Sequence, residues 1–598
     1  MTPMTLPVAV ITLVAFELLR VTGVVMDLSA FGVTVTLAGL AAAALTGPLM
    51  WWLGPRRALP AAMGALAAGR LLVQFPWARV MPVAVLAAAV AFAALLLAAR
   101  RRDEPGAVAR AVALAAGADV ALRLPLDLWD PVWRGGVLGW GVALVLAAAL
   151  AGLAVRAARA PAPAPVRVGD VRLALLGPAL ALYTALLASP GFVASQGGVT
   201  VTAAGLWIAA GTILGVRLLS DPLPPAVPPV ALAAAVFVFL FLPQPGLPLA
   251  PLAALVGVAV LPSVLARALT GALATGRGPL ADLALAGGAA GLAYGLMVVP
   301  DHLHYAPEAF PLAGALLLAV AAWRSRAAVV RRPFAPLLAA CLLLAAPPLL
   351  NAARPAPDPL PVDTAGGVYR MMTWNIHHAV SADGELSPED VLATIRGSGA
   401  HVVLLQEVPR GWLAAGGLDL VTWLERRLDA QAVFAPAEDR QSGNLILTSL
   451  PVTASQTGRL PEGEGATDRS YASVTVRLTD GETARITTAH LEGDDRGTRA
   501  RQLAEVVRTV GDDPHGVLAG DLNARPGSPE LNAALEAGLH SAQDEAGDPE
   551  QPTQREPRRR VDWILGGENV AFASFELSDV PASHVSDHAP LAVTVWLD

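Results

Sequence analysis

The sequence predicts a polytopic helical membrane domain followed by a soluble α/β domain, and three observations support this. The chain is 54% hydrophobic and 15% charged, with a mean hydropathy of +0.53, whereas a soluble domain carries about 25% charged residues. Apolar runs long enough to cross a bilayer recur from the N-terminus to about residue 352 and then stop. Beyond them, short apolar runs end in polar side chains, a pattern typical of buried strands. We therefore expect a membrane domain over residues 1–352, a linker rich in Pro and Ala over 353–367, and a soluble domain over 368–598.

The membrane domain is expected to contain about thirteen spans, each an apolar run of suitable length. They lie near residues 5–26, 31–53, 58–76, 80–99, 108–127, 135–156, 173–194, 198–218, 225–244, 248–269, 279–299, 308–325 and 334–352.

Arginines mark every second loop between these spans, which places those loops in the cytoplasm. The marked positions are Arg56-Arg57, Arg100-Arg101-Arg102, Arg156 with Arg159 and Arg167, Arg217, Arg267 with Arg277, and Arg324 through Arg332. With an odd number of spans, the N-terminus is cytoplasmic and the soluble domain is extracytoplasmic. The expected location is the cell membrane, as a multi-pass protein.

Charged side chains within the expected spans are the second feature of this domain, because an unpaired charge is costly inside a bilayer. Glu17 with Arg20, Arg70, and Asp119 with Arg123 are the main examples. Asp119 and Arg123 are four residues apart, so they can pair on one helical face. The alternative is a polar cavity for a headgroup or a transported substrate.

In the soluble domain, the stretch from Leu518 to Pro526 places two polar side chains at the end of an apolar strand. Asp521 and Asn523 are two residues apart and therefore face the same side of a strand end. A carboxylate there can position and deprotonate a water, and an amide can hold that water or a phosphate oxygen. The same residues also make ordinary turns, so this stretch alone leaves both interpretations open.

Other strands of this domain also carry polar groups at or near their ends. These are Asn375 after Val368–Thr373, Glu407 after Val402–Gln406, His490 after Thr487–Ala489, Asp562 within Arg560–Leu565, and Asp587 with His588 before the last strand. A helix should follow the first of them, with Ser387 as its N-cap, Pro388 as its first residue and Asp390 closing a capping box.

In chain order, the motifs Thr-Trp-Asn-Ile-His, Gln-Glu-Val, Thr-Ala-His-Leu, Gly-Asp-Leu-Asn, Arg-Val-Asp-Trp-Ile and Ser-Asp-His-Ala-Pro resemble the endonuclease/exonuclease/phosphatase superfamily of metal-dependent phosphoesterases. The resemblance covers roughly residues 368–598. It implies a four-layer α/β sandwich, two packed β-sheets flanked by helices, with one divalent-metal site at one edge of the sheets. It does not identify the substrate, because the superfamily includes nucleases, inositol-phosphate phosphatases and sphingomyelinases.

Phosphodiester hydrolysis needs a metal ion that offsets the phosphate charge, an activated water, and donors for the developing oxygens. Glu407 is the first candidate for a metal ligand, because a hard carboxylate at a buried strand end suits Mg²⁺ or Mn²⁺. The resemblance implies that Asn375 supports this metal site and orients Asp521. It also implies that Asp587 lies close enough to contribute.

The resemblance assigns the remaining catalytic roles as well. Asp521 would position or deprotonate the attacking water, and Asn523 would align that water. His588 would contact the scissile phosphate, and Asp562 would hold its imidazole in the productive orientation. His490 would be a second phosphate contact or a proton donor to the leaving group. Taken singly, each residue also fits a buried structural role.

We expect four further residues to contact substrate. Three lie in short segments that resemble family segments bordering the site, and the fourth, His378, follows Asn375 at the rim of the site. The four are Asn444, Arg469, Tyr471 and His378.

The charge of the soluble domain bears on its substrate. Over residues 353–598 the acidic side chains outnumber the arginines by about 17, which opposes general nucleic-acid binding. No Gly-x-x-x-x-Gly-Lys-Ser/Thr loop is present, so a nucleotide cofactor is not expected. Many spans followed by a phosphoesterase domain also resemble, in layout only, the eukaryotic proteins that remodel the lipid of glycosylphosphatidylinositol anchors.

The sequence therefore favours a Mg²⁺- or Mn²⁺-dependent phosphodiesterase or phosphatase that acts on a lipid or glycolipid phosphate at the extracytoplasmic surface. Membrane lipids would be its partners. Two alternatives stay open: a membrane-held extracellular nuclease, and a transporter or channel whose soluble domain recognises a ligand.

Overall fold

The computed structural model describes residues 5–597 apart from 28–39, 80–81, 101–104, 161–169, 221, 243–246, 271–277, 299–307, 324, 326–356, 382–383, 438–439, 464–467, 512 and 579–584. The chain divides into two compact units, Met1–Arg354 with Gly411–Leu418, and Pro355–Arg410 with Asp419–Asp598. The expected span 334–352 and the start of the expected linker lie outside the described residues.

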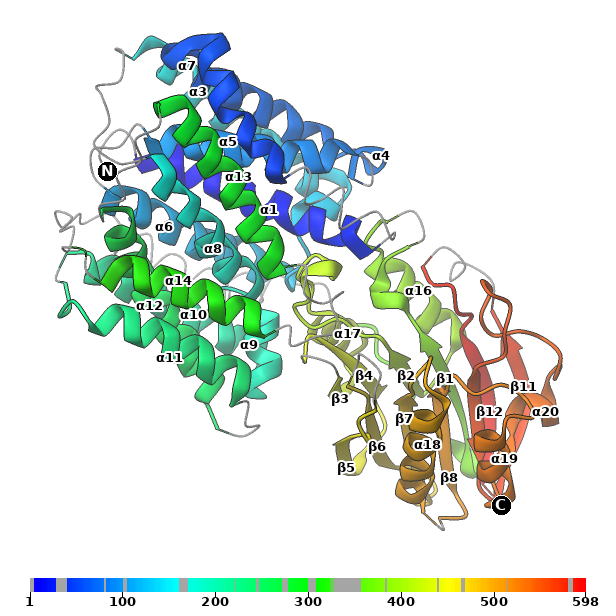
Figure 1. Ribbon diagram of the computed structural model, residues 1–598. Helices are drawn as coiled ribbons and strands as arrows, with labels where there is room; N and C mark the ends of the chain where they lie inside the picture. The colour runs from blue at the N-terminus through cyan, green and yellow to red at the C-terminus, as the bar shows by residue number, and fades with distance from the viewer. Residues whose placement is uncertain are drawn as a thin grey trace. The chain divides into compact units, whose positions relative to one another are not determined.

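The first unit is helical (Figure 1). Its helices are α1 Thr5–Asp27, α3 Thr46–Leu72, α4 Pro76–Arg79, α5 Pro82–Arg100, α6 Pro105–Arg123, α7 Gly136–Arg159, α8 Leu176–Ala181, α9 Pro190–Gly197, α10 Val201–Leu218, α11 Val227–Phe241, α12 Leu249–Thr270, α13 Pro279–Val298 and α14 Ala309–Trp323.

Six of the described helices are long and apolar enough to cross a membrane, or up to seven if the bent pair Val171–Leu187 and Pro190–Gly197 forms one span. The six are Thr5–Val24, Val83–Arg100, Gly136–Arg159, Val201–Leu218, Leu249–Thr270 and Pro279–Val298. These helices support a membrane domain. The expected total of about thirteen spans and the side on which the soluble domain lies stay predictions.

A cluster of buried charged side chains in the helical unit forms ion pairs between α1, α6 and the segment that follows α6. Arg20 of α1 donates to both carboxylate oxygens of Asp119 of α6, at 2.6 and 3.0 Å, and to Asp130 at 2.6 and 3.2 Å. Arg123 lies 3.0 Å from Asp130 and 3.6 Å from Asp119. The expected pair between Asp119 and Arg123 therefore exists, but Arg20 is the nearer partner of Asp119.

A second buried pair continues this cluster along α1. Arg70 of α3 donates to Glu17 at 2.8 Å through Nη2 and to the side chain of Gln74 at 3.0 Å through Nη1. The amide of Gln74 in turn donates to the carbonyl of Arg134 at 2.8 Å. Because each charge has an opposite partner, the geometry favours the structural interpretation over an open polar cavity.

Removing one partner of this cluster should be strongly destabilising, because it leaves a buried charge without compensation. Arg20→Gln removes the nearer of the two arginines that contact Asp119 and Asp130 and leaves Arg123 to balance both carboxylates. One buried negative charge is then uncompensated, so the free energy of unfolding should fall by about 3–5 kcal/mol. The matched control is Arg156→Gln in α7, whose side chain is exposed and where the change should stay within about 0.5 kcal/mol. Thermal and chemical unfolding of the detergent-solubilised protein measures both, and equal losses would contradict the structural role.

The second unit contains two six-stranded sheets whose strand orders are β11-β12-β1-β2-β4-β3 and β5-β6-β7-β8-β10-β9. We call them the first and the second sheet. The strands are β1 Val368–Asn375, β2 Val402–Gln406, β3 Gln431–Ala437, β4 Ser442–Thr448, β5 Val452–Arg459, β6 Ser470–Arg477, β7 Thr483–His490, β8 Gly516–Asp521, β9 His540–Ser541, β10 Asp562–Gly566, β11 Val570–Leu577 and β12 Leu591–Leu597.

The two sheets pack face to face, because their alternating apolar side chains form one core. Met371 of β1 and Leu404 of β2 meet Ile486 of β7, Val517 of β8 and Ile564 of β10 in this core. Burial of apolar area of this kind is the main favourable term in folding.

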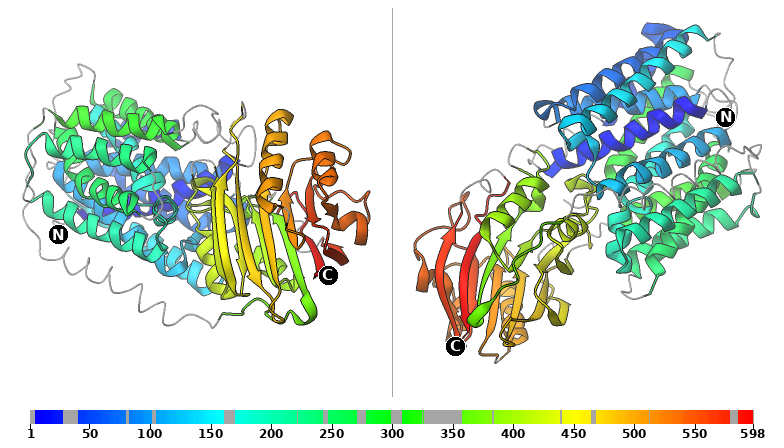
Figure 2. Two further views of the ribbon diagram at one scale, coloured as in Figure 1. Left: turned by 90° about the horizontal axis from the view of Figure 1, so that it is seen from below. Right: turned by 180° about the vertical axis from the view of Figure 1, so that it is seen from behind.

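Helices cover the outer faces and connect the parallel strands (Figures 1 and 2). They are α16 Pro388–Ser398, α17 Leu420–Leu428, α18 Arg496–Val510 and α19 Pro529–Glu536. A fifth helix, α20 Ala542–Ala546, packs against β10 and β11 and contributes Ala542 to the core between the sheets. Helices α18 and α19 pack on the outer face of the second sheet through Leu503, Val506 and Leu531. This is the expected α/β sandwich of two sheets flanked by helices.

The start of α16 corrects one detail of the sequence analysis. The helix begins at Pro388 with Ser387 at the N-cap position, as expected, but the Ser387 side chain makes no capping hydrogen bond. The capping box predicted from Asp390 is therefore wrong. The Ser387 backbone has φ −120° and ψ 60°, and its carbonyl accepts from Val391 N. The fixed φ of proline at the first position favours the helix start without a side-chain cap.

Candidate active site

Three adjacent strands of the second sheet bring polar side chains to the same edge. Strands β7 and β8 are parallel, with His490 paired to Asp521, and β10 runs antiparallel to β8, with Asp562 paired to Asp521. The register therefore places His490, Asp521 and Asp562 in one row. All three side chains are buried.

The first sheet delivers its polar groups to the matching edge. Strands β1 and β2 are parallel and pair Asn375 with Gln406, so Glu407 follows directly at the end of β2. His588 lies just before β12, which runs antiparallel to β1. Two hydrogen bonds fix the backbone that carries its ring. Trp374 donates to the His588 carbonyl at 3.0 Å, and His588 N donates to the side chain of Ser586 at 3.0 Å.

The side chain of Asn375 connects the polar residues of the first sheet with those of the second sheet. Its side-chain nitrogen donates to Glu407 Oε1 at 3.0 Å and to Asp521 Oδ2 at 3.1 Å, and its oxygen accepts from the backbone N–H of His377 at 3.1 Å. One amide thus fixes the distance between two carboxylates, one contributed by each sheet. This supports the expected role of Asn375 in orienting Asp521 and supporting the site around Glu407.

His588 and Asp562 form a close buried pair, with 2.8 Å between Nδ1 and Oδ2. The other ring nitrogen of His588, Nε2, lies 3.7 Å from Asp521 Oδ2. Burial lowers the pKa of His588, but the carboxylates of Asp562 and Asp521 outweigh it and raise the pKa well above the ordinary value. The ring is therefore charged at neutral pH, which strengthens the expected contact with a phosphate.

The surroundings of Asp521 also favour its protonated form, which for a carboxyl group is the neutral one. Burial and the neighbouring carboxylate of Asp562 raise the pKa of Asp521 to about 7, although the charge of His588 opposes them. A carboxyl group whose pKa lies near neutrality can accept a proton from water and release it again, which suits a general base.

Glu407 has the electrostatics of a cation ligand. Burial raises its pKa, but His378, His490 and His377 outweigh burial and hold the pKa well below the ordinary value, so the carboxylate is ionised. His378 Nε2 lies 3.2 Å from Glu407 Oε2. The backbone of Glu407 has φ +55°, so the chain turns sharply where the strand ends and presents the carboxylate to the other sheet.

Ionised oxygen donors near one another are what a hard divalent cation prefers. Glu407 supplies such a donor, and Asp521 is bonded to the same amide of Asn375 and therefore lies beside it. Asp521, Asp562 and His588 also form a compact buried group of possible ligands. Because Asp562 is bonded to the ring of His588, we assign this pair to hydrogen-bond chemistry with the phosphate. The cation site is assigned to Glu407, and Asp521 lies beside it as the proton acceptor. The donor set fits the metal that the sequence predicts.

His490 lies between these groups, 3.5 Å from Asp521 Oδ2 and 3.9 Å from Glu407 Oε1. Burial and the charge of Arg469, whose Nη1 is 3.0 Å from His490 Nδ1, lower the pKa of His490 well below the ordinary value. A neutral ring can donate one hydrogen bond to a phosphate. Proton donation to a leaving group by a charged ring is disfavoured in this environment, so the phosphate contact is the better of the two expected roles.

Asn523 and Asp587 lie at the border of the cluster. Asn523 has φ +50°, its N–H donates to Asp521 Oδ1 at 3.0 Å, and its side chain donates to the Leu491 carbonyl at 3.0 Å. Asp587 accepts from Gln554 at 3.0 Å and lies 3.9 Å from His588 Nε2. Both expected roles stay predictions.

The four expected substrate contacts differ in their placement. Arg469 and His378 touch His490 and Glu407, as described above. Asn444 is buried and its amide donates to the carbonyl of Ser470 at 2.8 Å, while Tyr471 accepts from Gln456 at 2.8 Å and packs in the core. In this structure Asn444 and Tyr471 are held by other side chains and the backbone, so their contact with substrate stays a prediction.

Sequence analysis missed two buried residues that support the site. Gln406 donates to Thr373 at 3.1 Å in its own sheet and to Thr488 at 2.9 Å in the other sheet. Thr553 donates to Asp562 Oδ2 at 2.6 Å. The glutamine at the end of the apolar run Val402–Gln406 could have predicted such a link, because a buried side-chain amide needs hydrogen-bond partners.

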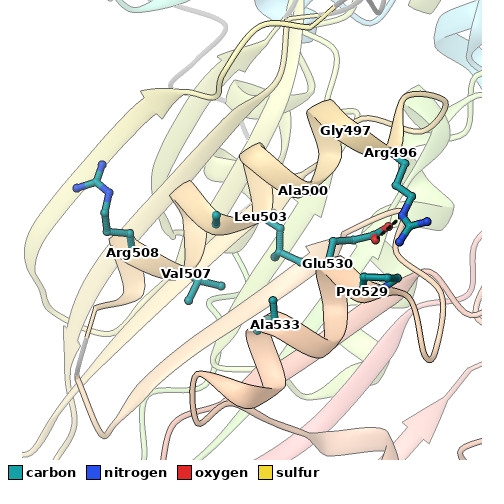
Figure 3. A pocket seen from close by; sticks show the side chains of 11 residues that line it. Arg496, Gly497, Ala500, Leu503, Val507, Arg508, Pro529, Glu530 and Ala533 are labelled. Atoms are coloured by element: carbon teal, nitrogen blue, oxygen red, sulfur yellow. Dashed lines mark hydrogen bonds and ion pairs between the residues drawn. The ribbon is translucent and has the colours of Figure 1, made fainter.

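A groove of about 620 Å³ between α18 and α19 is separate from this cluster (Figure 3). Its walls are mostly apolar and include Ala500, Leu503, Val507 and Ala533, and Arg496 lies beside Glu530 at one end. None of the polar residues described above lines it.

Comparison with known proteins agrees with this geometry. Residues 372–588 match the model of the Endonuclease/Exonuclease/phosphatase family. The C-terminal part of this chain is therefore a domain of that family, and the chain is a phosphoric ester hydrolase. No curated protein gives a significant match.

Among solved structures, an endonuclease/exonuclease/phosphatase from Beutenbergia cavernae DSM 12333 is 24% identical, with 38% of this chain and 72% of that chain covered and a TM-score of 0.34. Bacteroides thetaiotaomicron mannosyl-6-phosphatase Bt3783 is 14% identical over 38% of this chain and 99% of that chain, with a TM-score of 0.32. D. rerio TDP2 complexed with single-strand DNA product is 19% identical over 38% and 98%, with a TM-score of 0.31.

The pKa of Asp521 leads to a pH prediction. Hydrolysis should rise with pH through about 7, because the protonated carboxyl below that pH cannot accept a proton from water. Burial and the Asp562 carboxylate together raise this pKa, and Asp562→Asn removes the second cause, so the acid limb should move to lower pH. Its maximal rate should also fall, since His588 loses its charged partner. Measuring kcat/KM against pH for both proteins tests this, and an unmoved limb would contradict it.

Proposed function

We propose that this chain is a membrane-embedded, divalent-metal-dependent phosphodiesterase that hydrolyses a lipid or glycolipid phosphoester on the extracytoplasmic side of the membrane. The observation that carries the hydrolytic part is the amide of Asn375, which bonds both Glu407 and Asp521 and so gathers one carboxylate from each sheet. The membrane part rests on the apolar helices of the first unit.

Glu407, supported by Asn375 and with Asp587 nearby, would hold Mg²⁺ or Mn²⁺. The bound ion would offset the negative charge of the phosphate during hydrolysis. Ionised Glu407 fits this role because the neighbouring histidines keep its half-buried carboxylate charged.

The chain's own residues account for the remaining chemistry. Asp521 accepts a proton from the attacking water, and Asn523, whose N–H is bonded to Asp521, aligns that water. The Nε2–H of His588 donates to a phosphate oxygen, while the carboxylate of Asp562 accepts from Nδ1–H and fixes the ring. His490, as a neutral ring beside Arg469, provides a second N–H for the phosphate.

Two further observations support a lipid-linked substrate. The soluble domain has about 17 more acidic side chains than arginines, which disfavours a polyanion such as DNA or RNA. A single helix would suffice as an anchor, whereas six or more apolar helices precede this domain. The arginine pattern of the loops supports the extracytoplasmic side.

Release of a phosphorylated headgroup tests the substrate. The purified full-length protein should release it from some lipid in a panel of phospholipids and glycolipids when Mg²⁺ or Mn²⁺ is present, and EDTA should stop the reaction. Sealed vesicles with the protein in known orientation show whether only the outer-leaflet lipid is consumed. Turnover of DNA or RNA without turnover of any lipid would instead identify an extracellular nuclease. Ion or solute flux without hydrolysis would identify a transporter or channel.

Two nearly isosteric variants separate the proposed roles of the carboxylates. Glu407→Gln removes charge that would hold the cation, so its loss of activity should be partly relieved by more Mg²⁺ or Mn²⁺. Asp521→Asn removes the proton acceptor, so a loss of about 10²–10⁴-fold should persist at every metal concentration.

Initial rates on bis-p-nitrophenyl phosphate against metal concentration provide the measurement. Glu425→Gln in α17, away from the cluster, is the control and should keep the parental rate. Rescue of Asp521→Asn by metal, but not of Glu407→Gln, would show that the two roles are reversed. Parental rates in both variants would place the active site elsewhere.

A further inference from the structure

We propose that Thr553 is a positioning residue for phosphoester hydrolysis, because its hydroxyl group fixes the carboxylate of Asp562 and thereby the ring of His588. This inference rests on the roles proposed above for Asp562 and His588. Thr553 precedes β10 by nine residues and belongs to none of the motifs that predicted the site.

The hydrogen bonds around Thr553 determine which way its hydroxyl points. Its Oγ1 accepts from the backbone N–H of Val561 at 3.1 Å and of Asp562 at 3.0 Å. The third contact, 2.6 Å to Asp562 Oδ2, must therefore use the single hydroxyl hydrogen. A hydrogen bond to a charged acceptor at this distance is of the strong kind.

Asp562 depends on this bond for its orientation. Its Oδ2 accepts both from Thr553 and from Nδ1–H of His588, at 2.6 and 2.8 Å. Its Oδ1 is buried and has no hydrogen-bond partner among the described residues. Without the Thr553 hydroxyl, the ring of His588 alone would hold the carboxylate, which could then turn about χ2 and exchange its oxygens.

The backbone of Thr553 is hydrogen-bonded to the segment that leads to Asp562 and to the segment that carries His588. Its N–H donates to the Arg559 carbonyl at 2.9 Å, and its carbonyl accepts from the N–H of Ala589 at 2.7 Å. Ala589 directly follows His588, so one residue is bonded both to the carboxylate and to the chain that carries the imidazole. The side chain is fully buried, and its place does not depend on solvent.

Thr553→Val keeps the shape of the side chain and removes the hydroxyl. With bis-p-nitrophenyl phosphate and the full-length protein, kcat should fall about 10- to 100-fold, because the hydrogen bond to the charged Asp562 carboxylate is lost, while KM stays within about twofold. The N–H groups of Val561 and Asp562 also lose their acceptor, which lowers the free energy of unfolding. Thr553→Ser keeps the hydroxyl and should restore at least a third of the parental kcat. The control is Thr394→Val in α16, a buried threonine whose hydroxyl donates to a backbone carbonyl away from the site, and it should leave kcat unchanged.

A double-mutant cycle separates positioning from a general structural effect. In a His588→Gln background, Thr553→Val should cause no further loss, because the ring that it positions is gone. An equal loss in both backgrounds, a parental kcat for Thr553→Val, or failure of Thr553→Ser to restore activity would overturn the proposal. Thermal unfolding of each variant is recorded alongside, and if Thr553→Val is unfolded, the Thr553→Ser variant decides between the outcomes by its kcat.

Because the test uses a synthetic diester, its result for Thr553 does not depend on which natural substrate the enzyme hydrolyses. Turnover of the diester without turnover of any lipid would overturn the lipid assignment and leave the Thr553 result standing. Parental kcat in Thr553→Val with normal lipid hydrolysis would overturn only the role of Thr553. Absence of any turnover by the parent protein with Mg²⁺ or Mn²⁺ would overturn both.

Discussion

The side-chain amide of a buried glutamine links the two sheets of the hydrolase domain next to the site and fixes their relative position. Gln406 at the end of β2 donates to Thr373 in its own sheet and to Thr488 in the other sheet. Apolar packing between the sheets is favourable but non-directional, so it cannot by itself fix how one sheet is placed along the other. Breaking such a bond leaves a buried polar group unsatisfied, which costs about 1–3 kcal/mol. The next residue, Glu407, therefore meets Asp521 at a defined separation.

Strand register then distributes the catalytic groups. Parallel pairing of β7 with β8 and antiparallel pairing of β8 with β10 put His490, Asp521 and Asp562 side by side. A slip of one residue in either pair would turn these side chains to the other face of the sheet. The opposite pKa directions of His588 and His490 follow from this arrangement, since one ring faces carboxylates and the other faces the guanidinium of Arg469.

The sequence predicted the sandwich fold and the gathering of Asn375, Glu407, Asp521 and His588, because short motifs at strand ends carry both the fold and the chemistry. It could not predict Thr553, since its partner is reached through the path of a loop that has no periodic pattern. The Ser387 cap failed for a related reason, because a cap depends on side-chain rotation that local sequence does not fix. In the helical unit the sequence suggested Asp119 with Arg123. The stronger partner, Arg20, lies 99 residues away in the chain, where helical spacing gives no information.

The buried charges of the helical unit balance one another. Arg20, Arg70 and Arg123 face Glu17, Asp119 and Asp130, so the cluster has no net formal charge. An electric field across a bilayer does work of about 2.3 kcal/mol per elementary charge per 100 mV on a charge that crosses it. A neutral group of pairs that moves together experiences no net force from such a field. The helices it joins should therefore keep the same arrangement in energised and depolarised membranes, and any voltage sensitivity of the protein would have to come from charges outside this cluster.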